Sequence, residues 1–123
     1  MMLLDFESEK PIYIQLAESI EDAILSGAFQ EETQIPSTTE ISVTYKINPA
    51  TALKGINLLV NEGILYKKRG VGMFVSSGAQ ALIQKKHKED FLKNYIDTLV
   101  EEANKLNISK DEILLMIERR FSE

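Results

Sequence analysis

Residues 35–75 have the sequence IPSTTEISVTYKINPATALKGINLLVNEGILYKKRGVGMFV, and the rest of the chain is organised around them. It predicts two short helices joined by a tight turn and followed by a β-hairpin. Residues 64–66 and 73–75 are the β-prone runs of that hairpin, and residues 67–72 form the loop between them. This order is typical of a helix-turn-helix with a wing.

Local signals mark the ends of both helices. Ser37 and Glu40 have the spacing of a capping box, in which the serine caps the first turn and the glutamate reaches back to it. Asn48 is a strong N-cap residue, and Pro49 suits the first helical position because no N–H is needed there. Gly63 stands where a left-handed residue would end the second helix.

The second helix is predicted to have one buried side and one open side. The spacing of a buried helical face is followed by Ala52, Gly55, Ile56 and Leu59. The open side is polar and carries Ala50, Thr51, Lys54, Asn57 and Asn61. Its short side chains suit an approach to phosphates and base edges in a DNA major groove. Leu53 stands between the two sides, where it either packs against a neighbour or contacts a thymine methyl group.

The loop of the hairpin is basic. Lys67, Lys68 and Arg69 are adjacent cations that repel each other, and an anionic partner would explain them. Gly70 and Gly72 permit positive φ and leave no Cβ between the backbone and a minor groove. The alternative is a solvated turn that happens to be basic.

Six short pieces of the chain, taken in order, resemble the DNA-binding domain of GntR-type bacterial transcription regulators. They are residues 11–16 (PIYIQL), 24–29 (ILSGAF), 35–37 (IPS), 48–51 (NPAT), 61–65 (NEGIL) and 70–75 (GVGMFV). The helical tail that follows looks like that of the YtrA subfamily, whose members lack a large ligand-binding domain. The resemblance implies a dimeric regulator that represses its own operon, often one encoding an ABC transporter.

The resemblance also implies which residues contact DNA. They are Ser37, Thr39, Asn48, Pro49, Ala50, Thr51, Lys54, Arg69 and Gly70. The predicted DNA-binding set also includes Thr38, Leu53 and Lys68. Thr39 stands where most members carry an arginine that reaches the DNA. Pro49 replaces an arginine that is common at the start of the recognition helix, although Asn48-Pro49 is a familiar variant in the YtrA subfamily.

The net charge of −5 is distributed unevenly along the chain. Residues 33–78 carry five cations and two acids, a balance of +3, whereas residues 1–32 carry one cation and eight acids, a balance of −7. The remaining residues carry eight cations and nine acids. The predicted DNA face is thus the basic part of an acidic protein, so we expect modest affinity for DNA and a strong dependence on salt.

Composition bounds the other possibilities. With 123 residues, 44% of them hydrophobic and 27% charged, the chain predicts one globular domain with an appendage. It contains no cysteine, and its single histidine, His87, has no partner at ligand spacing, so we expect no metal site, no cofactor and no enzyme activity. No signal peptide is visible, and no apolar run approaches the ~20 residues that span a bilayer. We therefore expect a cytoplasmic protein without a membrane partner.

A further helix is predicted before the central stretch, from Pro11 to about Ser26, with Gly27 as its stop. Its apolar positions recur every four residues, at Ile12, Leu16, Ile20 and Ile24. The chain then divides into a winged helix-turn-helix domain, residues 1–76, and a helical dimerisation domain, residues 79–123. The predicted fold class is mainly α with a small β-hairpin.

The tail is predicted to form a two-helix hairpin that pairs with its copy in a second subunit. Residues 79–106 contain no proline or glycine and predict one long helix, and a capping box at Ser109 and Glu112 opens a final helix. This hairpin is too small to bury both apolar sides by itself. The expected dimerisation residues are Leu92, Tyr95, Ile96, Leu99, Val100, Ile113, Leu114, Ile117 and Phe121. A two-fold dimer would bind a palindromic operator with half-sites about one helical turn apart.

A second hypothesis comes from a different class of protein, a winged-helix module that binds a protein and not DNA. The missing arginine at position 39 and the negative net charge of the whole chain favour this second hypothesis. An effector is not indicated by the sequence, because the short tail leaves little room for an enclosed cavity, although a pocket between the last helices of a dimer is an alternative.

Overall fold

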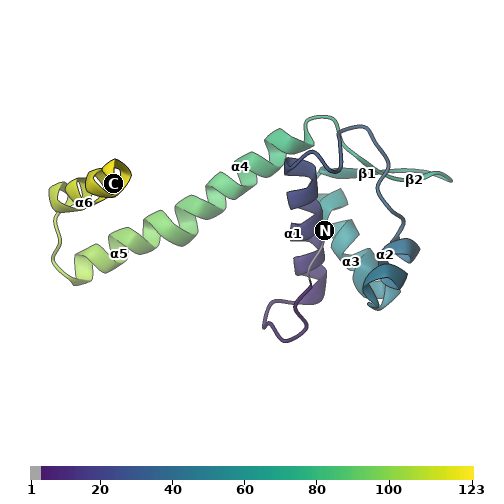
Figure 1. The fold of residues 1–123 in the computed structure, drawn as a ribbon, viewed down its shortest axis with the longest axis horizontal. Helices are drawn as coiled ribbons and strands as arrows, with labels where there is room; N and C mark the ends of the chain where they lie inside the picture. Colours follow the sequence, from purple (N-terminus) through teal and green to yellow (C-terminus); the bar gives the residue numbers. More distant parts are fainter. Residues whose placement is uncertain (1–3) are drawn as a thin grey trace. The chain divides into compact units, whose positions relative to one another are not determined.

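The computed structural model describes residues 4–123 of the chain (Figure 1). The chain divides into two compact units, Met1–Gln84 and Lys85–Glu123. The first unit extends beyond the boundary expected at residue 76, because Ala79 and Ile83, in the first turns of α4 (Ala79–Phe91), are fully buried in its core. The start of α4 is therefore part of the winged unit.

The first unit is mainly helical with one small antiparallel hairpin, which confirms the expected fold class. Its other elements are α1 (Ile12–Leu25), α2 (Thr38–Tyr45), α3 (Pro49–Asn61), β1 (Leu65–Lys68) and β2 (Gly72–Val75). In the hairpin, Leu65 pairs with Val75 and Lys68 pairs with Gly72. The order of elements is that of a helix-turn-helix followed by a wing.

Both helices of the motif begin where the local signals predicted. The Ser37 hydroxyl accepts a hydrogen bond from the backbone N–H of Glu40 at 3.1 Å, and the Glu40 carboxylate accepts one from the backbone N–H of Ser37 at 3.1 Å. The Asn48 side-chain oxygen accepts one from the backbone N–H of Ala50 at 2.8 Å. Helix α1 begins one residue later than predicted, because Pro11, with ψ of 145°, is its N-cap and not its first helical residue.

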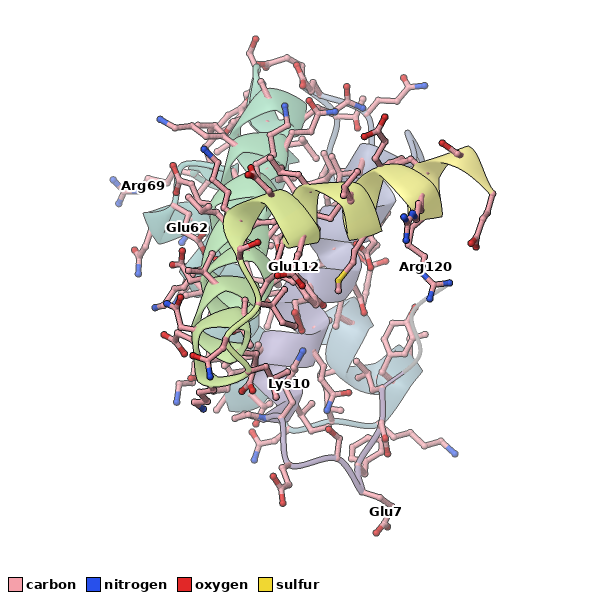
Figure 2. The ribbon with its side chains drawn as sticks, turned by 90° about the vertical axis from the view of Figure 1, so that its left-hand side faces the viewer. Glu7, Lys10, Glu62, Arg69, Glu112 and Arg120 are labelled. Atoms are coloured by element: carbon pink, nitrogen blue, oxygen red, sulfur yellow. The ribbon has the colours of Figure 1, made fainter. Side chains whose placement is uncertain are left out.

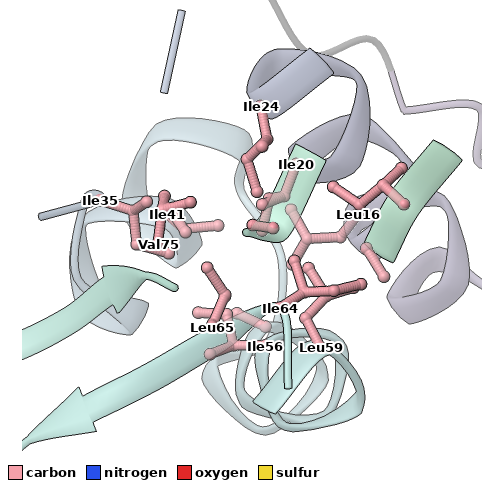
Figure 3. Packing of buried hydrophobic residues seen from close by; sticks show 14 of the residues in the cluster. Leu16, Ile20, Ile24, Ile35, Ile41, Ile56, Leu59, Ile64, Leu65 and Val75 are labelled. Carbon is pink, nitrogen blue, oxygen red and sulfur yellow. The ribbon is translucent and has the colours of Figure 1, made fainter. Parts of the chain in front are cut away.

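One apolar cluster holds α1, α2, α3, the hairpin and the start of α4 together (Figure 3). From α1 it contains three fully buried residues at the predicted spacing of four, namely Leu16, Ile20 and Ile24. From α3 it contains the side that was predicted to be buried, Ala52, Ile56 and Leu59, with Gly55 beside them. The hairpin and its approach add Ile64, Leu65 and Val75. Burial of each large aliphatic side chain contributes roughly 1.5–3 kcal/mol, so this cluster determines which side of α3 faces solvent.

The crossing of α1 and α3 depends on Gly55. A Cβ atom at this position would lie 2.8 Å from the carbonyl oxygen of Tyr13 and 3.2 Å from Cδ2 of Leu16. The nearer atom belongs to the backbone of α1, which cannot yield without moving the helix. The two helices therefore pack this closely only with a glycine at position 55.

The start of α4 is capped by a carboxylate from a distant part of the chain. Glu31 accepts hydrogen bonds from the backbone N–H groups of Gly78 at 2.8 Å and Gln80 at 3.1 Å. The Gln80 side chain in turn donates to the carbonyl of Ile24 at 3.0 Å. The bond from Gly78, and then that from Gln80, holds the pKa of Glu31 below its ordinary value. Glu31 thus satisfies N–H groups that a first helical turn leaves open.

The second unit differs from the single long helix that was expected. After α4 the chain forms a π-helical turn, η1 (Leu92–Ile96), and continues as α5 (Asp97–Lys105). The backbone N–H of Asp97 donates to the carbonyl of Leu92, five residues earlier, which is the bond of a π turn. Residues 79–105 are helical without a gap, as predicted, but one turn within them is a π turn. Neither proline nor glycine occurs in this region, so local sequence carries no signal for the change.

The last helix, α6 (Lys110–Ser122), begins after a tight turn in which Asn107 has a positive φ of 54°. The Ser109 hydroxyl accepts a hydrogen bond from the backbone N–H of Glu112 at 3.2 Å, and the capping box is complete, as predicted. Within Lys85–Glu123 the Ala103 side chain is the one that is buried, and the large apolar side chains of η1, α5 and α6 are largely exposed. Among the helices of residues 4–123, none combines the length and apolar character that a membrane crossing requires.

The Gly55→Ala substitution should destabilise the protein by about 1–3 kcal/mol, the usual effect of overpacking, even though alanine improves helix propensity by about 1 kcal/mol. Urea unfolding of both proteins at one protein concentration measures the difference. Asn57→Ala, on the exposed side of the same helix, is the matched control and should stay within about 0.5 kcal/mol of wild type. An unchanged midpoint for Gly55→Ala would refute the close crossing of α1 and α3.

The Glu31→Gln substitution should lower stability at neutral pH, and the difference from wild type should shrink in acid. Because the pKa of Glu31 is lower in the folded state than in the unfolded state, its charge stabilises the fold above the unfolded-state pKa. That contribution is lost as the pH falls through the folded-state pKa. Thermal unfolding between about pH 7 and pH 3 measures the trend. Glu9→Gln removes the same charge from the exposed N-terminal loop and serves as the control, and a deficit independent of pH would argue against a charged cap.

Candidate nucleic-acid interface

The N-terminus of α2 presents short polar groups to solvent. Thr38 and Thr39 occupy the first two helical positions, where backbone N–H groups have no acceptor within the helix. The Ser37 hydroxyl accepts from Glu40 and still has its own proton to donate. Thr39 is exposed, and Ser37 and Thr38 are half-buried. Open N–H groups, hydroxyls and the positive end of a helix dipole together suit a phosphate group.

The N-terminus of α3 is exposed but offers fewer backbone donors. Asn48, Pro49 and Ala50 are exposed, and Thr51 is half-buried. Pro49 has no N–H, and the N–H of Ala50 is bonded to the Asn48 side chain. The groups that this end can offer a partner are mainly side-chain groups, the amide nitrogen of Asn48 and the hydroxyl of Thr51. Such groups suit hydrogen bonds to base edges.

One turn further along α3, Leu53 and Lys54 line a groove on the surface. The groove is lined by Tyr13 of α1 and by Ala50, Leu53, Lys54, Asn57, Leu58 and Asn61 of α3. The Lys54 ammonium nitrogen lies 4.1 Å from the centroid of the Tyr13 ring, a cation–π contact. The Leu53 side chain is 45% exposed, so it lies outside the core and is open to a partner. The open side of α3 is therefore the side that the residue spacing predicted.

The cations of the wing are not all at its tip, as the sequence had suggested. The antiparallel ladder extends into the predicted loop, so Lys67 and Lys68 lie in β1, opposite Met73 and Gly72. Because side chains alternate along a strand, Lys67 and Lys68 point to opposite faces of the hairpin. Of the three adjacent cations, Arg69 alone stands at the tip. The prediction of a loop tip with three cations is therefore wrong.

The tip itself consists of Arg69, Gly70 and Val71. The Val71 N–H donates to the Lys68 carbonyl at 3.0 Å, which closes a turn whose third residue, Gly70, has φ of +77°. This φ is typical of the third position of a type II turn, where glycine is favoured. Arg69 is exposed and projects away from the ribbon (Figure 2). The tip thus offers one guanidinium and a backbone without a side chain, which suits a phosphate or the floor of a minor groove.

Aromatic contacts stiffen one face of the hairpin. The rings of Tyr66 and Phe74 stack with centroids 5.8 Å apart, and the Lys68 ammonium nitrogen lies 4.5 Å from the Phe74 centroid. The Tyr66 hydroxyl donates to the Glu32 carboxylate at 2.9 Å, and this bond raises the pKa of Tyr66. Lys68 therefore lies against the hairpin, whereas Arg69 extends beyond it.

None of the twelve expected DNA-binding residues is buried. They come from three segments: the start of α2, the first turns of α3 and the end of the hairpin. In the view of Figure 1, these elements lie on one side of α1. The first unit thus brings together helix N-termini, short polar side chains and an arginine-bearing tip, which is an arrangement suited to a nucleic-acid duplex.

Two residues that shape this surface were missed in the sequence. Tyr13 holds the Lys54 ammonium group, and Gln34 donates through Nε2 to the carbonyl of Val71 in the wing tip at 2.9 Å. Each contact joins residues that are far apart in the chain, so no local pattern predicts it. The one signal for Tyr13 was its place in the family-like stretch at residues 11–16.

Other chemistry in the described part of the chain is sparse. In residues 4–123, no three His, Cys, Asp or Glu side chains lie close enough together to hold a metal ion. His87 is exposed on α4. The Lys10–Glu18 ion pair, at 2.9 Å, lies at the surface, where such pairs add little stability.

Comparison with known proteins identifies the family. The sequence pattern of the bacterial regulatory proteins of the gntR family matches residues 12–75. A solved GntR-family transcriptional regulator from Bacteroides thetaiotaomicron is 38% identical, with a TM-score of 0.77, and the match covers 90% of this chain and 96% of that one. The HTH-type transcriptional repressor YtrA of Bacillus subtilis (strain 168) is 26% identical over 92% of this chain and 86% of its own length. The DNA-binding domain of AraR, solved in complex with operator ORX1, is 29% identical over 61% of this chain and 96% of its own, with a TM-score of 0.56.

The matched residues comprise α1, both helices of the motif and the wing, which is more than half of the chain. The similarity to YtrA continues beyond them into the helical tail. The chain therefore belongs to the gntR family of bacterial regulatory proteins, in its YtrA-like subfamily.

Proposed function

We propose that this DNA-binding transcription regulator is a dimeric repressor, which binds a palindromic operator and blocks access to the promoter. The promoter of its own operon is the first one to test, because the family resemblance implies that the protein regulates its own expression. It acts in the cytoplasm and has no catalytic role. The relative YtrA is itself a repressor, which supports the sign of regulation.

The observation that carries the proposal is the two-sided character of α3. Its inner side is fully buried at Ala52, Ile56 and Leu59, whereas its first residues, Asn48 to Ala50, are exposed. A helix fixed in this way presents its N-terminal residues as a rigid group. In a helix-turn-helix these residues contact base edges in the major groove.

Phosphate contacts are assigned to the segments on either side of α3. The start of α2 offers hydroxyls and open N–H groups, and Arg69 offers a guanidinium at the wing tip. Residues 33–78 carry a net charge of +3 within a chain of net charge −5. This local positive charge supports binding to a duplex, and the acidic remainder explains why the affinity should fall steeply with salt.

Dimerisation is assigned to the exposed apolar side chains of the second unit. Leu92 is 54% exposed, Val100 is 51% exposed and Phe121 is 87% exposed. Apolar side chains at this density are unusual on a surface that remains in water. A second copy of the chain would cover them, and its two-fold axis would match a palindromic operator.

The alternative of a winged-helix module that binds only proteins is not favoured. The relatives that the chain matches include HTH-type transcriptional repressors, and the DNA-binding domain of one relative, AraR, has been solved in complex with operator ORX1. Thr39 stands where an arginine was expected, and it is exposed at the start of α2, where it is accessible to DNA.

Titration of the protein against promoter DNA of its own operon at two salt concentrations tests the proposal. We expect a specific complex whose affinity falls as salt rises, with a slope of about −0.9 in log K against log salt for each phosphate contact. A scrambled duplex of the same length is the control. Absence of a specific complex at low salt would remove the proposed function.

Two substitutions should separate phosphate contacts from base contacts. Arg69→Ala should weaken binding to all sequences and reduce the salt slope by about 1, whereas Thr51→Ala should mainly reduce the preference for the operator. Lys88→Ala, which removes an exposed cation from the second unit, is the matched control and should leave both quantities unchanged. If both interface variants bind like wild type, the assigned roles are wrong.

The oligomeric state should depend on the apolar side of the tail. Val100→Glu should shift the protein from dimer to monomer in analytical ultracentrifugation and weaken operator binding, because a buried unpaired charge opposes association. Thr98→Glu adds the same charge at an exposed polar position of α5 and should leave the dimer intact. A wild-type protein that stays monomeric at micromolar concentration would contradict the assignment.

A further inference from the structure

The wing has a third strand-like segment beside β2. The Glu32 N–H donates to the Val75 carbonyl at 2.8 Å, and the Val75 N–H donates to the Thr33 carbonyl at 3.0 Å. The Ile35 N–H donates to the Met73 carbonyl at 3.0 Å, and Gln34 forms an antiparallel bridge with Phe74. The base of the wing is therefore anchored to the segment that leads into α2.

From this segment, the Gln34 side chain reaches the tip of the wing. Its Nε2 donates a hydrogen bond to the carbonyl of Val71 at 2.9 Å. Val71 is the last residue of the tip, and it directly follows Gly70. The contact therefore spans most of the length of β2 and ends next to the residues that are proposed to contact DNA.

The path of this side chain requires a glycine at position 72. A Cβ atom there would lie 2.5 Å from Gln34 Nε2 and 3.4 Å from Gln34 Cδ. Any side chain at position 72 would therefore displace the Gln34 amide. Because Gly72 has no side chain, there is room for the Gln34 amide that is bonded to the wing tip.

Both backbone polar groups of Val71, the last residue of the tip, therefore form hydrogen bonds. The Val71 N–H is bonded to the Lys68 carbonyl within the turn, and the Val71 carbonyl is bonded to Gln34. Arg69 and Gly70 lie between the two strands that these bonds fix. A hairpin tip without the second bond would be free to bend about the glycines at 70 and 72.

We propose that Gln34 is a positioning residue for DNA binding, which orients the wing tip through the Val71 carbonyl without touching DNA itself. The inference rests on the proposed role of Arg69 and Gly70 in DNA binding. Its physical basis is preorganisation, because a tip that is already ordered loses less conformational freedom when it meets the duplex. Gln34 therefore acts on affinity through the entropy of the tip.

The Gln34→Met substitution tests this role, because methionine has a similar length but no donor. We expect the heteronuclear NOE of the Gly70 and Val71 amides to fall in the free protein. We also expect operator affinity to fall about two- to tenfold, the usual effect of losing one neutral hydrogen bond. Gln30→Met makes the same change at an exposed position earlier in the loop and should alter neither quantity.

A double-mutant cycle with Arg69→Ala separates positioning from a general loss of stability. If Gln34 acts through the tip, Gln34→Met should have little further effect on affinity once Arg69 is removed. The thermal midpoint of Gln34→Met reports whether the fold is intact. An unchanged NOE at Gly70 and Val71, or affinity losses that simply add in the double variant, would overturn the inference.

The NOE measurement needs no DNA, so it distinguishes this inference from the proposed function. Suppose that Arg69→Ala weakens binding, and that Gln34→Met makes the tip flexible but keeps full affinity for the operator. This result would overturn the positioning role of Gln34 and leave the proposed function intact. If Arg69→Ala binds operator like wild type, the proposed role of the wing fails and the inference fails with it.

Discussion

Helices α1 and α3 cross closely at Gly55, and this contact sets the distance between the two largest helices of the helix-turn-helix unit. A side chain at this position would meet the Tyr13 carbonyl at 2.8 Å, so the two helices lie at backbone distance only because none is there. Leu16 lies beside this crossing and is fully buried, as part of the apolar cluster that determines which side of α3 faces inward. It also places the Tyr13 ring beside Lys54, on the open side of the same helix. The same pair of helices thus contributes to the buried side of α3 and to its open side.

The wing and the start of α4 pack into the same apolar core. Val75 ends β2 inside the apolar cluster, and Ala79 and Ile83 join the cluster a few residues later. Glu31 bonds to the first turn of α4, while its neighbour Glu32 bonds to Val75 in the wing. The loop that contains both glutamates therefore contacts the base of the wing and the beginning of the tail at once. A displacement of the first turns of α4 would act directly on the segment that supports the wing.

Much of this arrangement could be predicted from the sequence, because its signals are local. The caps at Ser37, Asn48 and Ser109 involve residues two or three positions apart, and the buried side of α3 follows from helical periodicity. The contacts that shape the interface are of another kind. Gln34 meets Val71 and Glu31 meets Gly78 across large separations, and neither pair has a sequence pattern before the fold brings it together. For the same reason the three basic residues of the wing could be located but not divided between strand and tip.

The chemistry of the two helix starts divides their roles in the proposed complex. At α3, Pro49 has no N–H and Asn48 occupies that of Ala50, so this helix end has little of the anion-binding capacity that open amides give. At α2, the N–H groups of Thr38 and Thr39 are free of intrahelical acceptors. This chemistry supports the proposal that α2 and Arg69 contact phosphates and that the start of α3 contacts the bases. The family resemblance implies arginines at the positions of Thr39 and Pro49, so in the proposed complex the chain would rely on the backbone amides of α2 and on Arg69 for its contacts with phosphates.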